Sequence, residues 1–274
     1  MKSAVTLTLV PETRQGPFVF SSGLADGFSA AAKLGFGGVE IFPASAAETE
    51  AGAIEELVAT HGVRVAAFGT GAGWVRHRLR LTDPDPIGRR RAIDFAAQIV
   101  ALAGRFGAPA IIGSMQGRVE EGVERERALE WLAEGLDELA TRAELHGVPL
   151  LYEFLNRYET NLCNTTADAL ALCQRLRSDN VRLLCDLFHM NIEEPDIAAA
   201  LRAAGSRLGH VHFADSNRRA AGLGHTDFAP VVTALRDLRY SGYLSAEVLA
   251  WPDPETAARQ TMASFRRLTA PGAG

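Results

Sequence analysis

The sequence predicts an α/β protein with the (β/α)8 TIM barrel fold, formed as a single domain. Eight short apolar segments, rich in β-branched residues, alternate with longer amphipathic stretches. No change of composition and no flexible linker divides the 274 residues, and such barrels typically run to about 250 residues. No GxGxxG motif follows the first apolar segment, which argues against an open dinucleotide-binding sheet.

The predicted strands are nearly unbroken apolar runs, as expected for parallel strands that helices cover on both faces. They span residues 4–10, 38–42, 63–68, 110–113, 148–155, 181–187, 209–214 and 243–248. In five places the end of a helical stretch, a glycine and a short apolar strand follow one another. Repeated βα units produce this pattern, and eight of them in one chain favour a closed barrel.

The predicted helices show the capping residues that begin and end helices in proteins. They span residues 45–61, 89–106, 120–146, 166–177 and 227–238. Ser45 is expected to cap the first helix, and Gly62 follows its last turn. Asn164 and Thr165 precede the fourth helix. We expect the basic run 89–91 to be the solvated start of the second helix.

The composition restricts the kinds of partner that the protein can bind. Apolar residues make up 47% and the net charge is −5, which argues against a general affinity for nucleic acids. The three cysteines form no CxxC pair, and no apolar stretch reaches the ~20 residues that span a bilayer. Nor does a basic and then apolar leader open the chain. We therefore expect a cytoplasmic protein with no membrane partner, a barrel over residues 1–268 and a disordered tail over 269–274.

Four ionisable residues stand inside the last four predicted strands. They are Glu153, Asp186, His212 and Glu247. An unpaired charge in an apolar strand is costly, and inward-facing carboxylates repel one another unless a cation lies among them. Because chemistry in this fold takes place at the C-terminal ends of the strands, the four residues predict a divalent metal site. Three carboxylates and one imidazole suit Mn²⁺, with Co²⁺ or Mg²⁺ as alternatives.

Other polar residues lie near the predicted mouth of the barrel. His210 shares a strand face with His212, and we expect His212 to be the ligand and His210 to be packed and hydrogen-bonded. His189 follows the sixth strand, where it can donate to a substrate oxygen. Arg218 can bind a hydroxyl, carboxylate or phosphate oxygen. Glu40 on the second strand has two equal interpretations, a substrate contact or a structural ion pair.

Three further residues are expected to be structural or to have minor roles. Arg219, next to Arg218, is expected to be solvated. Trp74, in a glycine-rich loop, can form a wall of a sugar pocket, although such loops are common after barrel strands. Cys185 is expected to be a small core residue beside Asp186.

Several stretches of the second half resemble the ketose 3-epimerases, the tagatose/psicose 3-epimerase-like branch of the xylose-isomerase-like TIM barrel sugar isomerases and epimerases. The stretches are YEFLNRYE at 152–159, NT at 164–165, DLFHMNIEE at 186–194, HFADSNR at 212–218 and Glu247. The residues FADSN at 213–217 depart from the pattern of the tagatose/psicose enzymes. The continuation 222–228 is similar to the broader sugar phosphate isomerases and inositol-catabolism relatives.

The resemblance implies that Glu153, Asp186, His212 and Glu247 are metal ligands, and that Glu153 and Glu247 are also the catalytic acid–base pair. It places Glu159, His189 and Arg218 around O1 and O2 of the substrate. A metal that binds a carbonyl and the adjacent hydroxyl stabilises an enediolate. Carboxylates on opposite faces can then invert the carbon between them.

We therefore expect an isomerase that epimerises a ketose or a keto-sugar acid, a small-molecule partner. An aldose–ketose or hydroxypyruvate-type isomerase is the alternative at the same site, since one carboxylate working on one face would isomerise instead. A zinc nuclease like endonuclease IV would need further histidines after the early strands, and FGTG at 68–71 and IGS at 112–114 offer none. A non-catalytic binding barrel would not need the acid–base carboxylates. A homo-oligomer formed through the barrel helices is compatible with the sequence.

Overall fold

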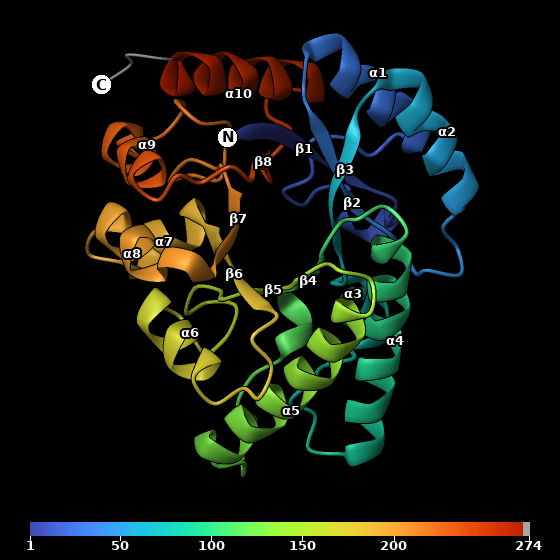
Figure 1. The fold of residues 1–274 in the computed structure, drawn as a ribbon, viewed down its shortest axis with the longest axis vertical. Coiled ribbons are helices and arrows are strands. Elements are labelled where there is room, and N and C mark those ends of the chain that lie inside the picture. Colours follow the sequence, from blue (N-terminus) through green and yellow to red (C-terminus); the bar gives the residue numbers. More distant parts are fainter. Residues whose placement is uncertain (271–274) are drawn as a thin grey trace.

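The barrel predicted from the sequence is confirmed. In a computed structural model that describes residues 1–270, eight parallel strands pair in chain order and β8 closes onto β1 (Figure 1). The strands are β1 (Lys2–Thr8), β2 (Gly38–Phe42), β3 (Arg64–Gly69), β4 (Ala110–Ile112), β5 (Leu150–Glu153), β6 (Val181–Asp186), β7 (Leu208–His212) and β8 (Tyr243–Ala246). All eight overlap the predicted strands; β1, β2 and β3 have the predicted length, and the other five are shorter by one to four residues.

Helices surround the barrel and cover the outer face of its sheet (Figure 1). They are α1 (Leu24–Leu34), α2 (Ala51–His61), α3 (Ala72–His77), α4 (Pro86–Gly104), α5 (Arg125–Glu144), α6 (Thr166–Cys173), α7 (Leu187–Glu193), α8 (Ile197–Ala204), α9 (Phe228–Asp237) and α10 (Pro254–Thr269). Short 3-10 turns lie at Pro11–Thr13, Ser114–Gln116 and Gly205–Arg207. The large apolar core lies between these helices and the strands.

The inside of the barrel has an apolar side and a polar side. Four buried residues on β3, β4, β5 and β6 form a separate apolar cluster, namely Ala67, Ile111, Leu151 and Leu184. The side chains of β2 and β7 that face one another across the barrel are Glu40, His210 and His212, all at most 5% exposed. Because these side chains are buried, their charges have to be paired with other groups of the protein.

The beginning of α2 differs from the prediction. The helix begins at Ala51 and not at Ser45, so Ser45 is not its N-cap. The Ser45 hydroxyl instead accepts a hydrogen bond from the amide of Glu48 and donates one to its carboxylate. A serine three residues before a glutamate thus closes an isolated turn ahead of the helix, a motif that resembles a capping box in sequence. Gly62 ends the helix in the left-handed conformation, as predicted.

The other predicted helices are present with shifted ends. The basic run 89–91 lies in the first turns of α4, where Arg90 forms an ion pair with Glu138 of α5 at 2.8 Å. Five helices were given no range by the prediction, namely α1, α3, α7, α8 and α10. The predicted tail begins at Thr269, which is still in α10, and residues 271–274 lie outside the described residues. Within residues 1–270, no helix is both long and apolar enough to cross a membrane.

The N-cap of α6 fixes the end of the loop that follows β5, and this loop leads away from the candidate site. The Thr165 hydroxyl accepts a hydrogen bond from the amide of Asp168, whose carboxylate accepts from the amide of Thr165. This reciprocal pair is a capping box. The Asp168 carboxylate also accepts from the amide of Asn164, so the box fixes the end of the loop as well as the helix.

The substitution Thr165→Ala should lower the free energy of unfolding by about 1 kcal/mol, since it removes the side-chain acceptor of the cap. Urea unfolding followed by circular dichroism measures this change. Thr165→Ser keeps the hydroxyl and should stay close to the wild type. Equal losses in the two variants would show that the methyl group, and not the cap, supplies the stability.

Candidate metal and sugar site

The four predicted ligands come together at the C-terminal end of the barrel. Glu153, Asp186 and His212 are the last residues of β5, β6 and β7, and Glu247 directly follows β8. One potential ligand atom from each lies within 4.8 Å of all the others. Strands that run in parallel and in register bring their ends to the same rim, so residues separated by 94 positions become neighbours.

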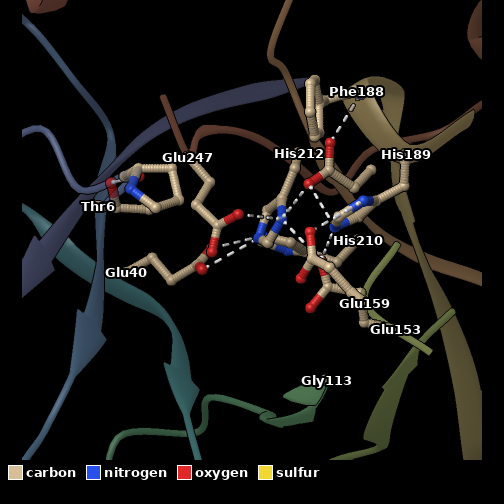
Figure 2. Close-up of polar contacts among 12 residues, drawn as sticks. Thr6, Glu40, Gly113, Glu153, Glu159, Phe188, His189, His210, His212 and Glu247 are labelled. Carbon is tan, nitrogen blue, oxygen red and sulfur yellow. Dashed lines mark hydrogen bonds and ion pairs between the residues drawn. The ribbon is translucent and has the colours of Figure 1, made fainter. Parts of the chain in front are cut away.

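The imidazole of His212 lies at the centre of this group (Figure 2). Its Nδ1 is 3.2 Å from Oε1 of Glu153, 3.4 Å from Oδ2 of Asp186 and 3.5 Å from Oε2 of Glu247. Oε1 of Glu153 is buried and has no hydrogen-bond partner. A buried carboxylate oxygen without a hydrogen-bond donor is rare, because it destabilises the folded state. It indicates that the group binds a ligand through this oxygen.

The pKa values of the group reflect its crowded charges. Burial raises the pKa of Glu247 to about 8, an effect that His212 opposes and Glu153 adds to. Burial alone would also raise the pKa of Asp186, but His189 and His212 hold it well below its ordinary value. The pKa of His212 lies well above the ordinary value in spite of burial, because Glu247 and other carboxylates surround it. The carboxylates thus compete for the available positive charge.

His189 lies beside the quartet on α7, at most 1% exposed. Its Nε2 is 3.6 Å from Oδ2 of Asp186 and 3.9 Å from Oε1 of Glu153, and it has no hydrogen-bond partner. Its Nδ1 lies 2.6 Å from the side-chain nitrogen of Asn156. Asn156 therefore holds the ring so that Nε2 faces the quartet. Glu159, with its side chain 44% exposed, lies 3.8 Å from Nδ1 at the outer edge of the group.

Arg218 reaches the group from the loop after β7. Its guanidinium hydrogen-bonds the Glu247 carboxylate and lies 3.6 Å from a carboxylate oxygen of both Asp186 and Glu159. The guanidinium also stacks over the ring of Phe188, 4.7 Å from its centroid. Carboxylates on several sides raise the pKa of Arg218 further, although burial opposes the charge.

The loop that carries Arg218 is anchored by a residue that the sequence analysis did not select. The buried Asp215 carboxylate accepts hydrogen bonds from the amides of Ser216, Gly222 and Thr226. Arg218 itself has a positive φ of 58°, which is uncommon for a residue other than glycine. The expected role of Arg219 as a solvated residue is wrong in part, because its guanidinium stacks on the Trp251 ring at 3.7 Å.

Glu40 makes the contacts of an ion pair, the second of its two interpretations, and it also lines the cavity described below, so a substrate contact stays a prediction. Its Oε2 is 2.8 Å from Nε2 of His210, and its Oε1 is 3.1 Å from Nε2 of His212. Burial alone would raise the pKa of Glu40, but the two histidines hold it well below its ordinary value. His210 is buried and hydrogen-bonded, as expected. Glu40, His210 and His212 form a second compact group, which shares His212 with the quartet.

A cavity of about 450 Å³ opens above the quartet. Its polar floor includes Glu153, His189, His212, Arg218 and Glu247. Its walls include Trp74, as the sequence analysis allowed, and apolar residues that it did not select, namely Phe18, Phe42 and Leu155. Phe18 and Phe42 touch, with ring centroids 4.6 Å apart. Such a cavity, apolar at its sides and charged at its floor, suits a small polar ligand.

The chain is similar to known sugar epimerases over part of its length. It is 36% identical to the L-ribulose 3-epimerase of Mesorhizobium japonicum over 159 residues, 57% of this chain and 54% of that protein. It is 37% identical to the 3-dehydro-D-guloside 4-epimerase of Escherichia coli over 132 residues, 48% of this chain and 49% of that protein. The matches thus span about half the length of these curated relatives.

The likeness to solved structures extends over nearly the whole chain. A structure of L-ribulose 3-epimerase superimposes with a TM-score of 0.81 at 26% identity and covers 96% of this chain and 93% of that one. The model of one family matches residues 28–268, which include every strand except β1. This match, the closed barrel and the quartet at its C-terminal end agree. The chain belongs to the xylose isomerase-like TIM barrel family.

Proposed function

We propose that the protein is a divalent-metal-dependent sugar epimerase that inverts the carbon next to the carbonyl of a ketose. The observation that carries the proposal is the quartet Glu153, Asp186, His212 and Glu247, whose ligand atoms lie within 4.8 Å of one another and three of whose members line the cavity. The epimerase names of the relatives support the same chemistry. Its location in the cytoplasm is part of the proposal.

The residues of the quartet fit a divalent metal. Three carboxylates and one imidazole are hard and borderline donors, which suit Mn²⁺, with Co²⁺ or Mg²⁺ as alternatives. The buried Oε1 of Glu153 needs a partner. Gly113, after β4, makes room for the other oxygen, because a Cβ at this position would lie 2.4 Å from Oε2 of Glu153. The chain therefore leaves space and donor atoms for a cation.

The proposed reaction uses the two glutamates as an acid–base pair. A divalent metal, when bound, stabilises the negative charge of the enediolate and so lowers the barrier to loss of the C–H proton. Glu153 and Glu247 come from β5 and from the end of β8, so they approach a substrate from different directions. One carboxylate takes the proton from one face, and the other returns a proton to the opposite face.

Three neighbouring side chains are proposed to hold the substrate oxygens. His189 has a free buried Nε2 that faces the quartet. The Arg218 guanidinium and the Glu159 carboxylate lie 3.6 Å apart at the cavity edge. Together they supply donors and an acceptor for O1 and O2 of a ketose, and they fix which face of the sugar meets each glutamate.

The charges that line the cavity favour a neutral sugar over a keto-sugar acid or a phosphate ester. Five glutamates line it, namely Glu12, Glu40, Glu153, Glu159 and Glu247. Arg218 is the one lining residue with a guanidinium or ammonium group among residues 1–270, and Glu247 and Glu159 already pair with it. An anionic substrate would add negative charge among these carboxylates, and no guanidinium or ammonium group of the lining is free to pair with it. No feature of the site favours the zinc nuclease, since β3 ends at Gly69 and Gly113 follows β4.

The variant Gly113→Ala should bind Mn²⁺ about tenfold or more weakly, because its methyl group would displace the Glu153 carboxylate. Isothermal titration of Mn²⁺ into chelator-treated protein measures the change. Gly52→Ala is the matched control, since a Cβ at Gly52 meets nothing within 4 Å. Unchanged affinity in Gly113→Ala would exclude Glu153 as a ligand in this position.

Turnover of a ketose with Mn²⁺ in D₂O should place one solvent deuterium at the inverted carbon. The variant Glu247→Gln should lower turnover and deuterium incorporation together by about 10²–10⁴-fold, the contribution expected of an acid–base residue. Glu134→Gln, the same change at an exposed position of α5, should have no effect. Product without deuterium, or full activity in Glu247→Gln, would contradict the proposed mechanism.

A panel of ketoses, keto-sugar acids and ketose phosphates tests the charge of the substrate. The value of kcat/KM should be at least about tenfold higher for the preferred neutral ketose than for its phosphate ester, since the cavity offers no unpaired guanidinium or ammonium group to the phosphate. Higher salt should reduce the difference by screening the carboxylates. Preference for a phosphate or an acid at every ionic strength would refute the neutral assignment.

A further inference from the structure

Glu40 is the one carboxylate of the barrel floor outside the quartet that contacts His212 in the described residues. It lies on β2, whereas His212 lies on β7, with β1 and β8 between them in the ring. The contact therefore spans the inside of the barrel and does not follow from strand pairing. Glu40 is 5% exposed and His212 is 1% exposed, so both partners of the contact are buried.

The two nitrogens of His212 face two different groups. Nε2 lies 3.1 Å from the Glu40 carboxylate, and Nδ1 lies 3.2–3.5 Å from the three carboxylates of the quartet. An imidazole that binds a metal is neutral and carries one proton, so one nitrogen donates a hydrogen bond while the other offers its lone pair. An ionised carboxylate only accepts hydrogen bonds. The proton therefore belongs on Nε2, and the lone pair of Nδ1 faces the quartet.

His210 holds Glu40 in the orientation that this contact needs. Its Nε2 lies 2.8 Å from Oε2 of Glu40, so each oxygen of the carboxylate has its own imidazole (Figure 2). The rings of His210 and His212 meet edge to face, at 88° and 5.7 Å between centroids. With both oxygens engaged, the Glu40 carboxylate cannot rotate without losing a buried hydrogen bond.

We propose that Glu40 is a positioning residue for the metal ligand His212, and that His210 holds the Glu40 carboxylate in place. It sets the Nε2–H form of His212 and the angle of its ring, so that Nδ1 is ready to bind a divalent cation. The inference rests on the proposed function, because it assumes that the quartet binds a metal. Hydrogen-bonded partners of this kind orient metal-binding histidines and increase the basicity of the ligand nitrogen.

Glu40, His210 and His212 also have atoms close enough to suggest a second metal site. The separations of 2.8 and 3.1 Å are those of direct hydrogen bonds between the carboxylate and the two imidazoles. The three side chains thus satisfy one another, and a second ion would have to break both bonds. We therefore assign them one structural role and not a second cation.

The first test is the substitution Glu40→Gln, which keeps the shape of the side chain. In glutamine an NH2 group replaces one of the two oxygens, so one of the two histidines would face a donor in place of an acceptor. Mn²⁺ titrated into the chelator-treated variant should bind about 10–100-fold more weakly than to the wild type. Glu134→Gln, the same chemical change at an exposed position, should leave the affinity unchanged.

The second test reads the proton position directly in the wild-type protein. With ¹⁵N-labelled histidine and Zn²⁺ as a diamagnetic probe, His212 should give the NMR signature of an Nε2–H imidazole bound through Nδ1. In Glu40→Gln a smaller fraction of His212 should give this signature at the same Zn²⁺ concentration, because the ring is no longer held with Nδ1 toward the quartet. The wild-type spectrum remains informative even if the variant does not fold.

Three results would overturn the inference. They are an unchanged Mn²⁺ affinity in Glu40→Gln, an Nδ1–H signal for His212 in the Zn²⁺-loaded wild type, and a second bound Mn²⁺ that Glu40→Gln abolishes. Failure of the wild-type protein to bind any of these metals would be a different outcome. It would refute the proposed function first, and the role of Glu40 with it.

Discussion

The placement of four carboxylates around one imidazole at the centre of the barrel is the constraint on which the rest of the site depends. Glu40, Glu153, Asp186 and Glu247 all lie within 3.5 Å of His212. So many anionic groups in a buried volume repel one another unless positive charge lies among them. Arg218 and the proposed metal are the sources of that charge, and the Asp215 carboxylate holds the loop that carries Arg218.

The fold supplies this arrangement because parallel strands end at one rim. The apolar cluster on β3 to β6 fills one side of the barrel with side chains that need no partners. At the same depth β2 and β7 carry Glu40 and His210, whereas Glu153 and Asp186 of β5 and β6 lie only at the C-terminal rim of the barrel. The protein thus concentrates the cost of buried charge in one region and keeps ordinary packing elsewhere. Buried polar groups that are fully paired also specify one conformation more strictly than apolar packing does.

The fold and the quartet could be predicted from the sequence because both depend on local patterns. Apolar runs separated by helices predicted the barrel, and a charge inside an apolar strand was visible without a structure. The pairing of Glu40 with the two histidines was not, because it joins β2 and β7 across the barrel. Gly113 was missed for a similar reason, since its contact with Glu153 depends on neighbouring strand ends. The ends of helices were the least predictable, since turns such as the one at Ser45 imitate caps.

The order of the ligands along the chain has a consequence for how the protein is made. All four members of the quartet lie between residues 153 and 247, and the last of them follows the strand that closes the ring onto β1. A ribosome therefore releases the first half of the barrel before any ligand exists. The growing chain has no complete ligand set until Glu247 has been synthesised. The complete ligand set for the proposed ion is thus present only when the last strand is available to close the barrel.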